Sequence, residues 1–369
     1  MPDRAASLGL SLALLFFGAA GARAVERPAP RKIQVAEGVF VFVTPSYGDV
    51  GLDGNSVVVL SDDGVLVFDS NGTPAATEAV LREIRRLTDQ PVRYVVNSHW
   101  HWDHWYGTQV YAREFPGLTV IAHEGTRRMM LGPALDFNRP GIESQLPAYI
   151  TSLERGLAAA EAAQPPTPAA TALRRRIEDA RSFLEQKRNV QHVFPDLTFS
   201  DTLTLHLGGR EIRLRHAGRA VTPGDVFLYL PKERLLVTGD LLVNPVSFAL
   251  SCYPTGWLKA LETLDALDAP VIVPGHGEPL HDEALLHATM QVFRELQRQG
   301  RDAHARGLDV DGAAVAILPS LDAPRRTITR DEPALNEAFR VQLVDWFLHR
   351  VYEEQAGPLD DTIARIPER

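Results

Sequence analysis

The chain has 369 residues, with 38 Lys and Arg against 47 Asp and Glu, so its formal net charge at pH 7 is −9. The acidic balance, and the lack of a Lys/Arg-rich stretch interleaved with aromatic residues, argue against nucleic acid as a partner. The single cysteine, Cys252, excludes an internal disulfide. A chain of this length can hold one large two-sheet core with additional segments.

The N-terminus is predicted to be a targeting segment. Arg4 precedes an apolar run over residues 8–17 that is too short to cross a bilayer. Ala22-Arg23-Ala24 then supplies a small-x-small cleavage site. We therefore expect a signal peptide over residues 1–24, a Pro-rich charged linker over 25–36, and a secreted or periplasmic protein without a stable membrane span after cleavage. An uncleaved anchor is the alternative.

Short apolar runs rich in β-branched residues predict the first strands. These runs cover residues 39–44, 55–60, 64–69 and 92–97. Between the third and fourth runs, helical spacing predicts a helix over 74–87, with Thr73 as its cap and Pro74 at its first position. Strands and helices therefore alternate in this part of the chain.

Three imidazoles and one carboxylate follow the fourth strand within six positions. In extended backbone His99, His101 and Asp103 project to one side, because side chains alternate with a period of two. His104 follows as the chain turns towards a helix. Imidazole nitrogen and carboxylate oxygen suit Zn²⁺, with iron and manganese as competitors. A lone histidine is usually structural, but four residues of metal-ligand type at this spacing indicate a metal site.

Residues 133–195 interrupt the alternation of strands and helices. Two helical patterns, at about 146–163 and 171–188, flank a Pro-rich segment. They predict a helical hairpin inserted into the core, which is either a lid over the site or a scaffold.

The rest of the chain returns to strands and ends in helices. Strand patterns resume over residues 196–240, and an amphipathic helix is expected over 255–267. We predict a helical C-terminal extension over 283–369, with helices near 284–298 and 333–354 joined by a loop. Aromatic residues at helical spacing in the last helix indicate that it packs on the core.

The ordered motifs resemble the metallo-β-lactamase superfamily. Residues 99–104 carry its His-x-His-x-Asp-His signature, and three further apolar runs deliver Asp69, Asp240 and His276 in the order that the family requires. Each of these polar residues lies just past the end of its run, where α/β layers gather their ligands. The resemblance implies an α+β fold, an αββα four-layer sandwich with helices outside two facing mixed sheets, over residues 37–282.

The resemblance also implies a metal centre whose two sites share one carboxylate. The first site would use His99 and His101, the second would use Asp103, His104 and His276, and Asp240 would bridge them. One position departs from the family motif Gly-x-Ala-His-Thr-x-Gly-Asp, because Val221 replaces the third histidine of the first site. We therefore expect one tightly bound Zn²⁺ and a weak or empty second site, with iron or manganese as alternatives.

Three further residues have alternative interpretations. His216 faces inward at the end of its strand and is a candidate substitute ligand, although a core-edge histidine bonded to backbone is favoured. Asp69 either fixes the tautomer of a ligand imidazole or caps a strand end. Arg219, close to Val221, either supplies positive charge where a metal is missing or binds an anionic substrate group, although a solvated loop arginine is favoured.

The function implied by the resemblance is that of a zinc-dependent hydrolase acting on a small molecule, with activity reduced by the loss at Val221. Metal-bound hydroxide would attack an acyl-type bond of a lactam, lactone, thioester or ester, and Asp103 is the catalytic candidate that orients or deprotonates the water. Two alternatives stay open. One is a binding or accessory protein that keeps the fold and a metal without turnover. The other is an iron-dependent redox relative, for which no flavin-binding segment is visible.

Overall fold

The computed structural model describes residues 29–48, 50–163 and 169–363. The predicted signal peptide and the Pro-rich segment of the insert lie outside these ranges. Every helix within them is too short or too polar to cross a membrane. The predicted linker ends earlier than expected, because Arg31–Ala36 forms strand β1 and pairs with the next strand.

In the described part of the chain, a seven-stranded sheet with the order β1-β2-β3-β4-β5-β6-β7 faces a five-stranded sheet with the order β12-β11-β10-β9-β8. The strands of the first sheet are β1 (Arg31–Ala36), β2 (Val39–Val43), β3 (Ser56–Ser61), β4 (Gly64–Phe68), β5 (Val92–Val96), β6 (Thr119–His123) and β7 (Leu197–Phe199). Those of the second are β8 (Thr202–Leu207), β9 (Arg210–His216), β10 (Val226–Leu230), β11 (Leu235–Val237) and β12 (Val271–Val273). Both sheets are mixed: β1 to β4 pair antiparallel and β4 to β7 parallel, while β12 joins β11 in parallel.

Helices lie on the outer faces of the two sheets and in the additions to them. Those before the second sheet are α1 (Pro74–Leu87), α2 (Trp102–Trp105), α3 (Thr108–Glu114), α4 (Glu124–Met130), α5 (Pro133–Pro140), α6 (Leu146–Ala162) and α7 (Ala169–Arg188). The helices that follow β11 in the chain are α8 (Pro254–Asp265), α9 (Ala284–Ala305), α10 (Val310–Ile317), α11 (Asp322–Thr329), α12 (Pro333–Ala338) and α13 (Trp346–Ala356). Helix α1 has the predicted bounds, and the Thr73 side chain accepts a hydrogen bond from the backbone N–H of Ala76.

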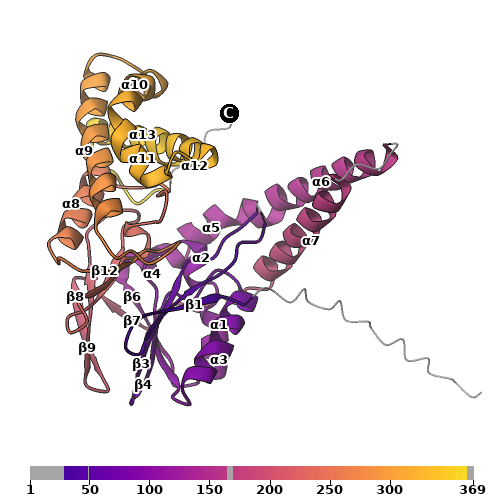
Figure 1. Ribbon diagram of the computed structural model, residues 1–369, viewed down its shortest axis with the longest axis vertical. Helices are drawn as coiled ribbons and strands as arrows, with labels where there is room; N and C mark the ends of the chain where they lie inside the picture. Colours follow the sequence, from indigo (N-terminus) through magenta and orange to yellow (C-terminus); the bar gives the residue numbers. More distant parts are fainter. Residues whose placement is uncertain (1–28, 49, 164–168, 364–369) are drawn as a thin grey trace, which may run out of the picture.

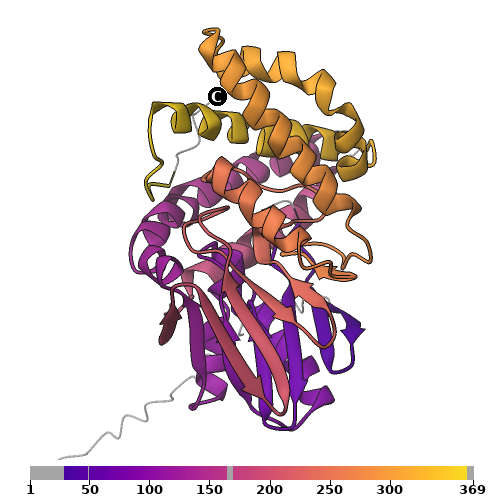
Figure 2. The same cartoon turned by 90° about the vertical axis from the view of Figure 1, so that its left-hand side faces the viewer.

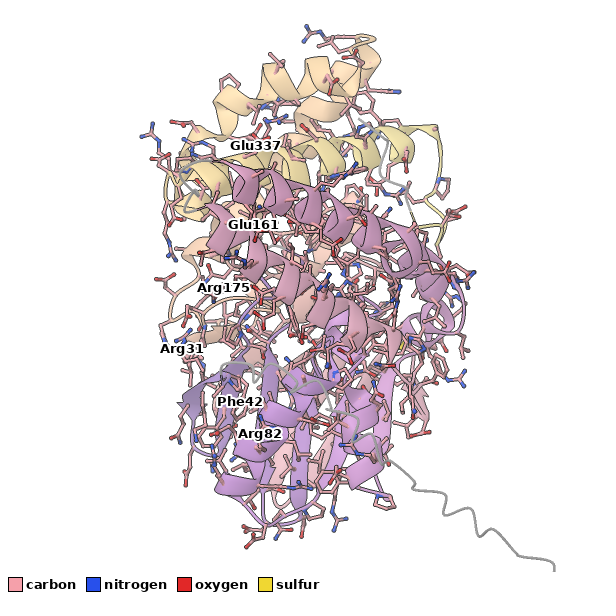
Figure 3. All side chains as sticks on the ribbon, turned by 90° about the vertical axis from the view of Figure 1, so that its right-hand side faces the viewer. Arg31, Phe42, Arg82, Glu161, Arg175 and Glu337 are labelled. Carbon is pink, nitrogen blue, oxygen red and sulfur yellow. The ribbon has the colours of Figure 1, made fainter. Side chains whose placement is uncertain are left out.

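Alternation along the strands builds the layers. Val57 and Val59 of β3 face the second sheet and join a core that includes Leu214 and Leu228. Val58, between them, faces the other way and packs beneath α1 and α3. Figure 3 looks onto this helix layer, and Arg82 on α1 is exposed. The predicted αββα sandwich is confirmed.

Helices α8 and α9 and the C-terminal helices pack on the outer face of β10, β11 and β12, while the described helices leave β8 and β9 uncovered on that side (Figure 2). Phe227 of β10 joins a buried cluster with Trp257 of α8 and Phe293 of α9. Leu343 and Phe347 complete that cluster from the tail, as their spacing predicts. The expected loop between the tail helices is instead helical, because α10 and α11 fill it and pack on α9.

Helices α6 and α7 form an antiparallel hairpin that projects from the body of the molecule (Figure 1). Ion pairs cross between the two helices, Arg174 with Glu161 and Arg181 with Glu154. Exposed pairs of this kind contribute little to stability, so the hairpin depends on its apolar contacts. Only the base of the hairpin reaches the sandwich, where the C-terminal end of α7 packs beside α2.

Candidate metal centre

Strand ends from both sheets meet at one edge of the sandwich. Asp69 follows β4 and the His99 loop follows β5, both in the first sheet. Asp240 follows β11 and His276 follows β12 in the second sheet. Parallel pairing of β4 with β5, and of β11 with β12, puts the carboxyl ends of each pair at the same edge.

Four side chains of the predicted second site converge on one point. The Nε2 atom of His104 lies 3.4 Å from Asp103 Oδ2 and 3.2 Å from Asp240 Oδ1. The Nε2 atom of His276 lies 3.1 Å from Asp103 Oδ2 and 3.5 Å from Asp240 Oδ1. Ligands held 2.0–2.1 Å from a tetrahedral zinc ion lie about 3.3 Å apart. The four atoms therefore have the spacing of a zinc coordination sphere.

The atoms that point into this cluster lack ordinary hydrogen bonds. Within the described residues, His99 Nε2, His104 Nε2 and Asp240 Oδ1 are buried without a hydrogen-bond partner. Leaving such groups unpaired costs about 1–3 kcal/mol each, so their convergence fits a cation. Glycine backbones close the site, since a Cβ at Gly54 would lie 2.5 Å from His104 and one at Gly275 2.1 Å from Asp240.

The residues of the predicted first site lie beside the same carboxylate. His99 Nε2 is 3.4 Å from Asp240 Oδ2, and His101 Nδ1 is 3.7 Å from that oxygen. Asp240 thus presents one oxygen to each group of imidazoles, as a bridging carboxylate would. This group contains two imidazoles and one shared carboxylate, one ligand fewer than the other.

Asp69 orients both buried imidazoles. Its Oδ2 accepts hydrogen bonds from His104 Nδ1 at 2.8 Å and from the Ser98 hydroxyl at 2.7 Å, while Oδ1 accepts from the Ser98 backbone N–H at 2.7 Å. Because the Ser98 hydroxyl donates to Asp69, its oxygen is left to accept from His99 Nδ1 at 2.8 Å. Both rings then turn Nε2, the nitrogen that would ligate a metal ion, towards the cluster. Asp69 has the tautomer-fixing geometry, and Ser98 is a contributor that sequence analysis missed.

Electrostatics keep the two carboxylates charged. Burial alone would raise the pKa of Asp240, but His104 and His276 hold it well below its usual value. Burial opposes ionisation of Asp103 in the same way, and the same two histidines lower its pKa. Burial and the neighbouring imidazoles lower the pKa of His99 to about 4. Charged carboxylates and a neutral His99 are the forms that bind a metal ion.

Val221 lies in an apolar environment. It is buried in the cluster that also contains Ala220 and Trp257. The residues that follow form a turn, since Asp225 accepts from the Thr222 backbone N–H at 2.7 Å and from its hydroxyl at 3.0 Å. This segment therefore forms an ordered turn with an apolar side chain at the position expected for a ligand.

His216 is not brought into the metal cluster. Its Nδ1 lies 3.0 Å from the backbone carbonyl of Asp225, and its ring stacks on His123 with centroids 3.7 Å apart. The groups of close metal-binding side chains found in the described residues do not include it. This is the backbone-bonded position that the favoured interpretation expects.

Sequence analysis missed Lys187 at the base of the inserted hairpin. Its buried Nζ lies 3.4 Å from the centroid of the Trp102 ring and 4.2 Å from that of Tyr106. Burial lowers the pKa of Lys187 well below its usual value. A signal was available, because Lys187 continues the buried stripe of α7 through Ala180 and Leu184.

Comparison with known proteins identifies the family. Residues 49–276, more than half of the chain, match the sequence profile of the metallo-beta-lactamase superfamily. The chain belongs to the metallo-beta-lactamase superfamily. This superfamily usually binds zinc, and its members include hydrolases such as alkylsulfatases and β-lactamases.

Individual members are distant from this chain in sequence. A linear primary-alkylsulfatase from a Pseudomonas species is 21% identical over 261 residues, which cover 64% of this chain and 44% of that protein. The chain therefore spans less than half the length of this relative. A solved metallo-beta-lactamase from Pontibacter korlensis has a TM-score of 0.51 at 20% identity, covering 72% of this chain and 99% of that chain. The solved stereoselective inverting sec-alkylsulfatase from a Pseudomonas species has a TM-score of 0.58 at 16% identity, covering 89% of this chain and 50% of that chain.

Proposed function

We propose that this protein is a metal-dependent hydrolase of a small molecule and that its tight site uses Asp103, His104, His276 and Asp240. The observation that carries the proposal is the spacing of their ligand atoms, 3.1–3.5 Å between imidazole nitrogen and carboxylate oxygen. Two imidazoles and two carboxylates suit Zn²⁺, and manganese or iron would compete for the same donors. His99, His101 and the second oxygen of Asp240 would hold a weaker ion.

A zinc ion supplies, when bound, acidification of water to a pKa of about 7 and polarisation of a substrate oxygen. Asp103 is the catalytic candidate: one oxygen faces His104 and His276, and its carboxylate would orient the water and accept its proton. Asp240 would offer one carboxylate oxygen to each group of imidazoles, so its negative charge would be shared between the two sites. Asp69 would hold the Nδ1 protons of His104 and, through Ser98, of His99, so both rings stay in the ligating tautomer.

The bond that we propose is cleaved is an acyl-type bond in a lactam, lactone, thioester or ester. Attack on any of these bonds needs an activated water molecule and a cation that polarises the substrate oxygen. A metal ion held by this donor set would supply both without a nucleophilic side chain. The substrate itself is left to a screen, because one fold supports many chemistries.

A sulfate ester is the second candidate substrate. The specific observation is that similarity to the sec-alkylsulfatase covers 89% of this chain, and similarity to the Pontibacter lactamase covers 72%. Because the sec-alkylsulfatase is only 16% identical to this chain, its greater coverage shows a likeness of fold alone. The alkylsulfatase relative in sequence also covers more than half of this chain.

The test is a substrate panel read against metal content. The zinc-loaded chain should hydrolyse at least one chromogenic lactam, lactone, thioester, carboxylic ester or alkyl sulfate, and Asp103→Asn should lower kcat by at least about 100-fold. Asp89→Asn, an exposed change away from the site, is the matched control and should behave as the wild type.

Other outcomes separate the alternatives. A chain that binds one zinc ion and turns over none of these substrates would support the accessory protein that the loss at Val221 suggests. Equal activity in wild type and Asp103→Asn would contradict the role of Asp103. Export to a periplasmic or extracellular space remains part of the proposal, and N-terminal sequencing of the mature protein would test cleavage after Ala24.

A further inference from the structure

A carboxylate near the C-terminal end of the described chain lies between two guanidinium groups. Asp361 Oδ2 is 2.5 Å from Arg128 of α4, and Oδ1 is 2.5 Å from Arg219. The Tyr253 hydroxyl donates to Asp361 Oδ1 at 3.0 Å and to the backbone carbonyl of Asp360 at 3.0 Å. We call Arg128, Arg219 and Tyr253 the arginine cradle. Two guanidinium groups and one hydroxyl form a receptor for an oxyanion.

The cradle is built by the sandwich and not by the segment that occupies it. The Arg219 guanidinium lies 4.1 Å from the centroid of the Tyr253 ring, which orients it. The backbone of this loop is fixed to the start of α8, since Tyr253 N donates to Ala220 O at 2.7 Å and a Cβ at Gly256 would lie 1.9 Å from Arg219 O. Arg219 and Tyr253 are therefore positioned by contacts that do not involve Asp361.

The cradle and the strap are each linked to the loop that carries His99. Arg219 stands two residues before Val221, in the motif that usually supplies a metal ligand. The same loop is tied to the His99 loop by the hydrogen bond from Val226 N to Ser98 O at 2.9 Å. Ile363, two residues after Asp361, packs on the cluster that contains Trp100, between His99 and His101.

The segment that occupies the cradle is a strap over residues 357–363. It forms neither helix nor strand. Cavities of about 600 Å³ and 390 Å³ open on it, and both are lined by Arg219 and Leu359. The larger cavity also contains Tyr253 and Arg301, and the smaller contains Arg128. Space for a ligand thus adjoins the guanidinium groups on both sides.

We propose that the arginine cradle is a binding site for the anionic group, sulfate or carboxylate, of a ligand of this protein, and that Asp361 occupies it as an internal competitor. Its assignment to the substrate rests on the proposed function. The ligand displaces the Asp361 carboxylate from the cradle, no covalent bond changes, and the strap leaves the face that carries Trp100.

A tethered competitor lowers the apparent affinity for a free anion. A flexible tether of this length holds its group at an effective concentration on the order of millimolar. The apparent affinity falls in proportion to the fraction of molecules whose cradle is open. If the strap occupies the cradle in nine molecules of ten, removing its charge raises the affinity for a free oxyanion about tenfold.

The test uses the metal-loaded full chain and measures binding without turnover. Calorimetric titration with sodium sulfate, and separately with sodium acetate at the same ionic strength, should show at least about tenfold tighter binding to Asp361→Asn than to the wild type. Asp360→Asn is the matched control, because its carboxylate accepts from Thr362 within the strap, while Arg128 and Arg219 pair with Asp361. This variant removes the same charge from the neighbouring residue and should bind sulfate and acetate as the wild type does.

A second variant assigns the gain to the cradle. Asp361→Asn combined with Arg219→Gln should lose the gain while its metal content and melting temperature match those of Asp361→Asn. A gain for either ion supports the proposal, and the ion with the larger gain identifies the oxyanion class. Equal binding to wild type and Asp361→Asn, or a gain that survives Arg219→Gln, overturns it.

The outcome for the proposed function is read separately. Where the enzyme has an anionic substrate, Asp361→Asn should lower KM with kcat unchanged, and KM for a neutral ester should stay the same. A chain that binds sulfate more tightly after Asp361→Asn but turns over nothing contradicts the proposed function and leaves the anion site supported.

Discussion

Asp69 shows how one buried residue controls a metal centre that it does not enter. Its two oxygens accept from Ser98 and His104, so the orientation of two imidazoles depends on one carboxylate. Asp69 has a positive φ of 61°, a backbone conformation that Asp tolerates better than most residues. The side chain, the backbone and the strand end therefore all favour an acidic residue at this position.

Replacing Asp69 should weaken metal binding before it harms the fold. Asp69→Asn keeps the shape but removes the charge that stabilises the Nδ1 protons, so we expect metal affinity to fall by about 10–100-fold. Competition with a chromogenic chelator measures the change. Asp89→Asn is the exposed control, and an unchanged metal affinity in Asp69→Asn would contradict the tautomer-fixing role.

Val221 offers a gain-of-function test at the same scale. The turn held by Thr222 and Asp225 is intact, so Val221→His should return a third imidazole to the first group. We expect bound zinc to rise from about one to about two ions per chain, since three imidazoles and a carboxylate complete a four-ligand site. Metal analysis after dialysis measures it, and Val221→Thr controls for loss of apolar packing. One ion per chain in Val221→His would show that the slot is misaligned.

At the scale of elements, α7 connects the inserted hairpin to the metal loop. Its C-terminal end places Lys187 against Trp102 and Tyr106, on either side of Asp103 and His104 in the sequence. A cation over two aromatic rings gains up to about 2 kcal/mol, while burial of an amine without a hydrogen bond costs about 1–3 kcal/mol. Because the cost of burial is higher still for a charged ammonium, it outweighs the contact with the rings, and the lowered pKa of Lys187 has the same direction.

Removing that amine should therefore stabilise the protein. Lys187→Met keeps most of the volume and should raise the free energy of unfolding at pH 7 by about 1–2 kcal/mol, measured by urea denaturation. The unfolded chain binds the Lys187 proton more tightly than the folded chain, so stability of the wild type rises with pH towards about 10.4. The advantage of the variant should shrink over the same range.

The control for this effect is Lys232→Met, which changes an exposed lysine in the turn between β10 and β11. It should leave stability within about 0.5 kcal/mol of the wild type at each pH. A lower free energy of unfolding in Lys187→Met would mean that the aromatic contacts outweigh the cost of burial.

At the scale of the whole molecule, the metal centre joins the two sheets. Asp103 and His104 come from the first sheet, and Asp240 and His276 come from the second. An ion held by all four ties the layers together at one edge. The C-terminal helices add a further layer, because they share one buried cluster with β10, β11 and β12.

Metal removal should therefore lower the stability of the entire sandwich. With zinc at 100 times its dissociation constant, binding contributes about 2.7 kcal/mol, and a chelator should remove that amount. Calorimetric melting with and without chelator measures the loss, and added zinc should restore the wild type. In Asp103→Asn the chelator should have a smaller effect. A melting temperature that ignores complete metal removal would contradict this coupling of the sheets.

The sequence by itself determined the residues and their order: the apolar runs, the Thr73 cap of α1, and the His-x-His-x-Asp-His loop with Asp69, Asp240 and His276 at later strand ends. Periodicity and motif spacing are local properties, so they can be identified without coordinates. Only the tertiary structure shows that His216 lies against the Asp225 carbonyl, that Lys187 packs on Trp102, and that Asp361 pairs with Arg128 and Arg219. Those contacts join residues up to 233 positions apart, such as Arg128 and Asp361, and no local pattern specifies them. Burial and pairing of charges depend on which surfaces the layers bring together, and that is a property of the packed molecule.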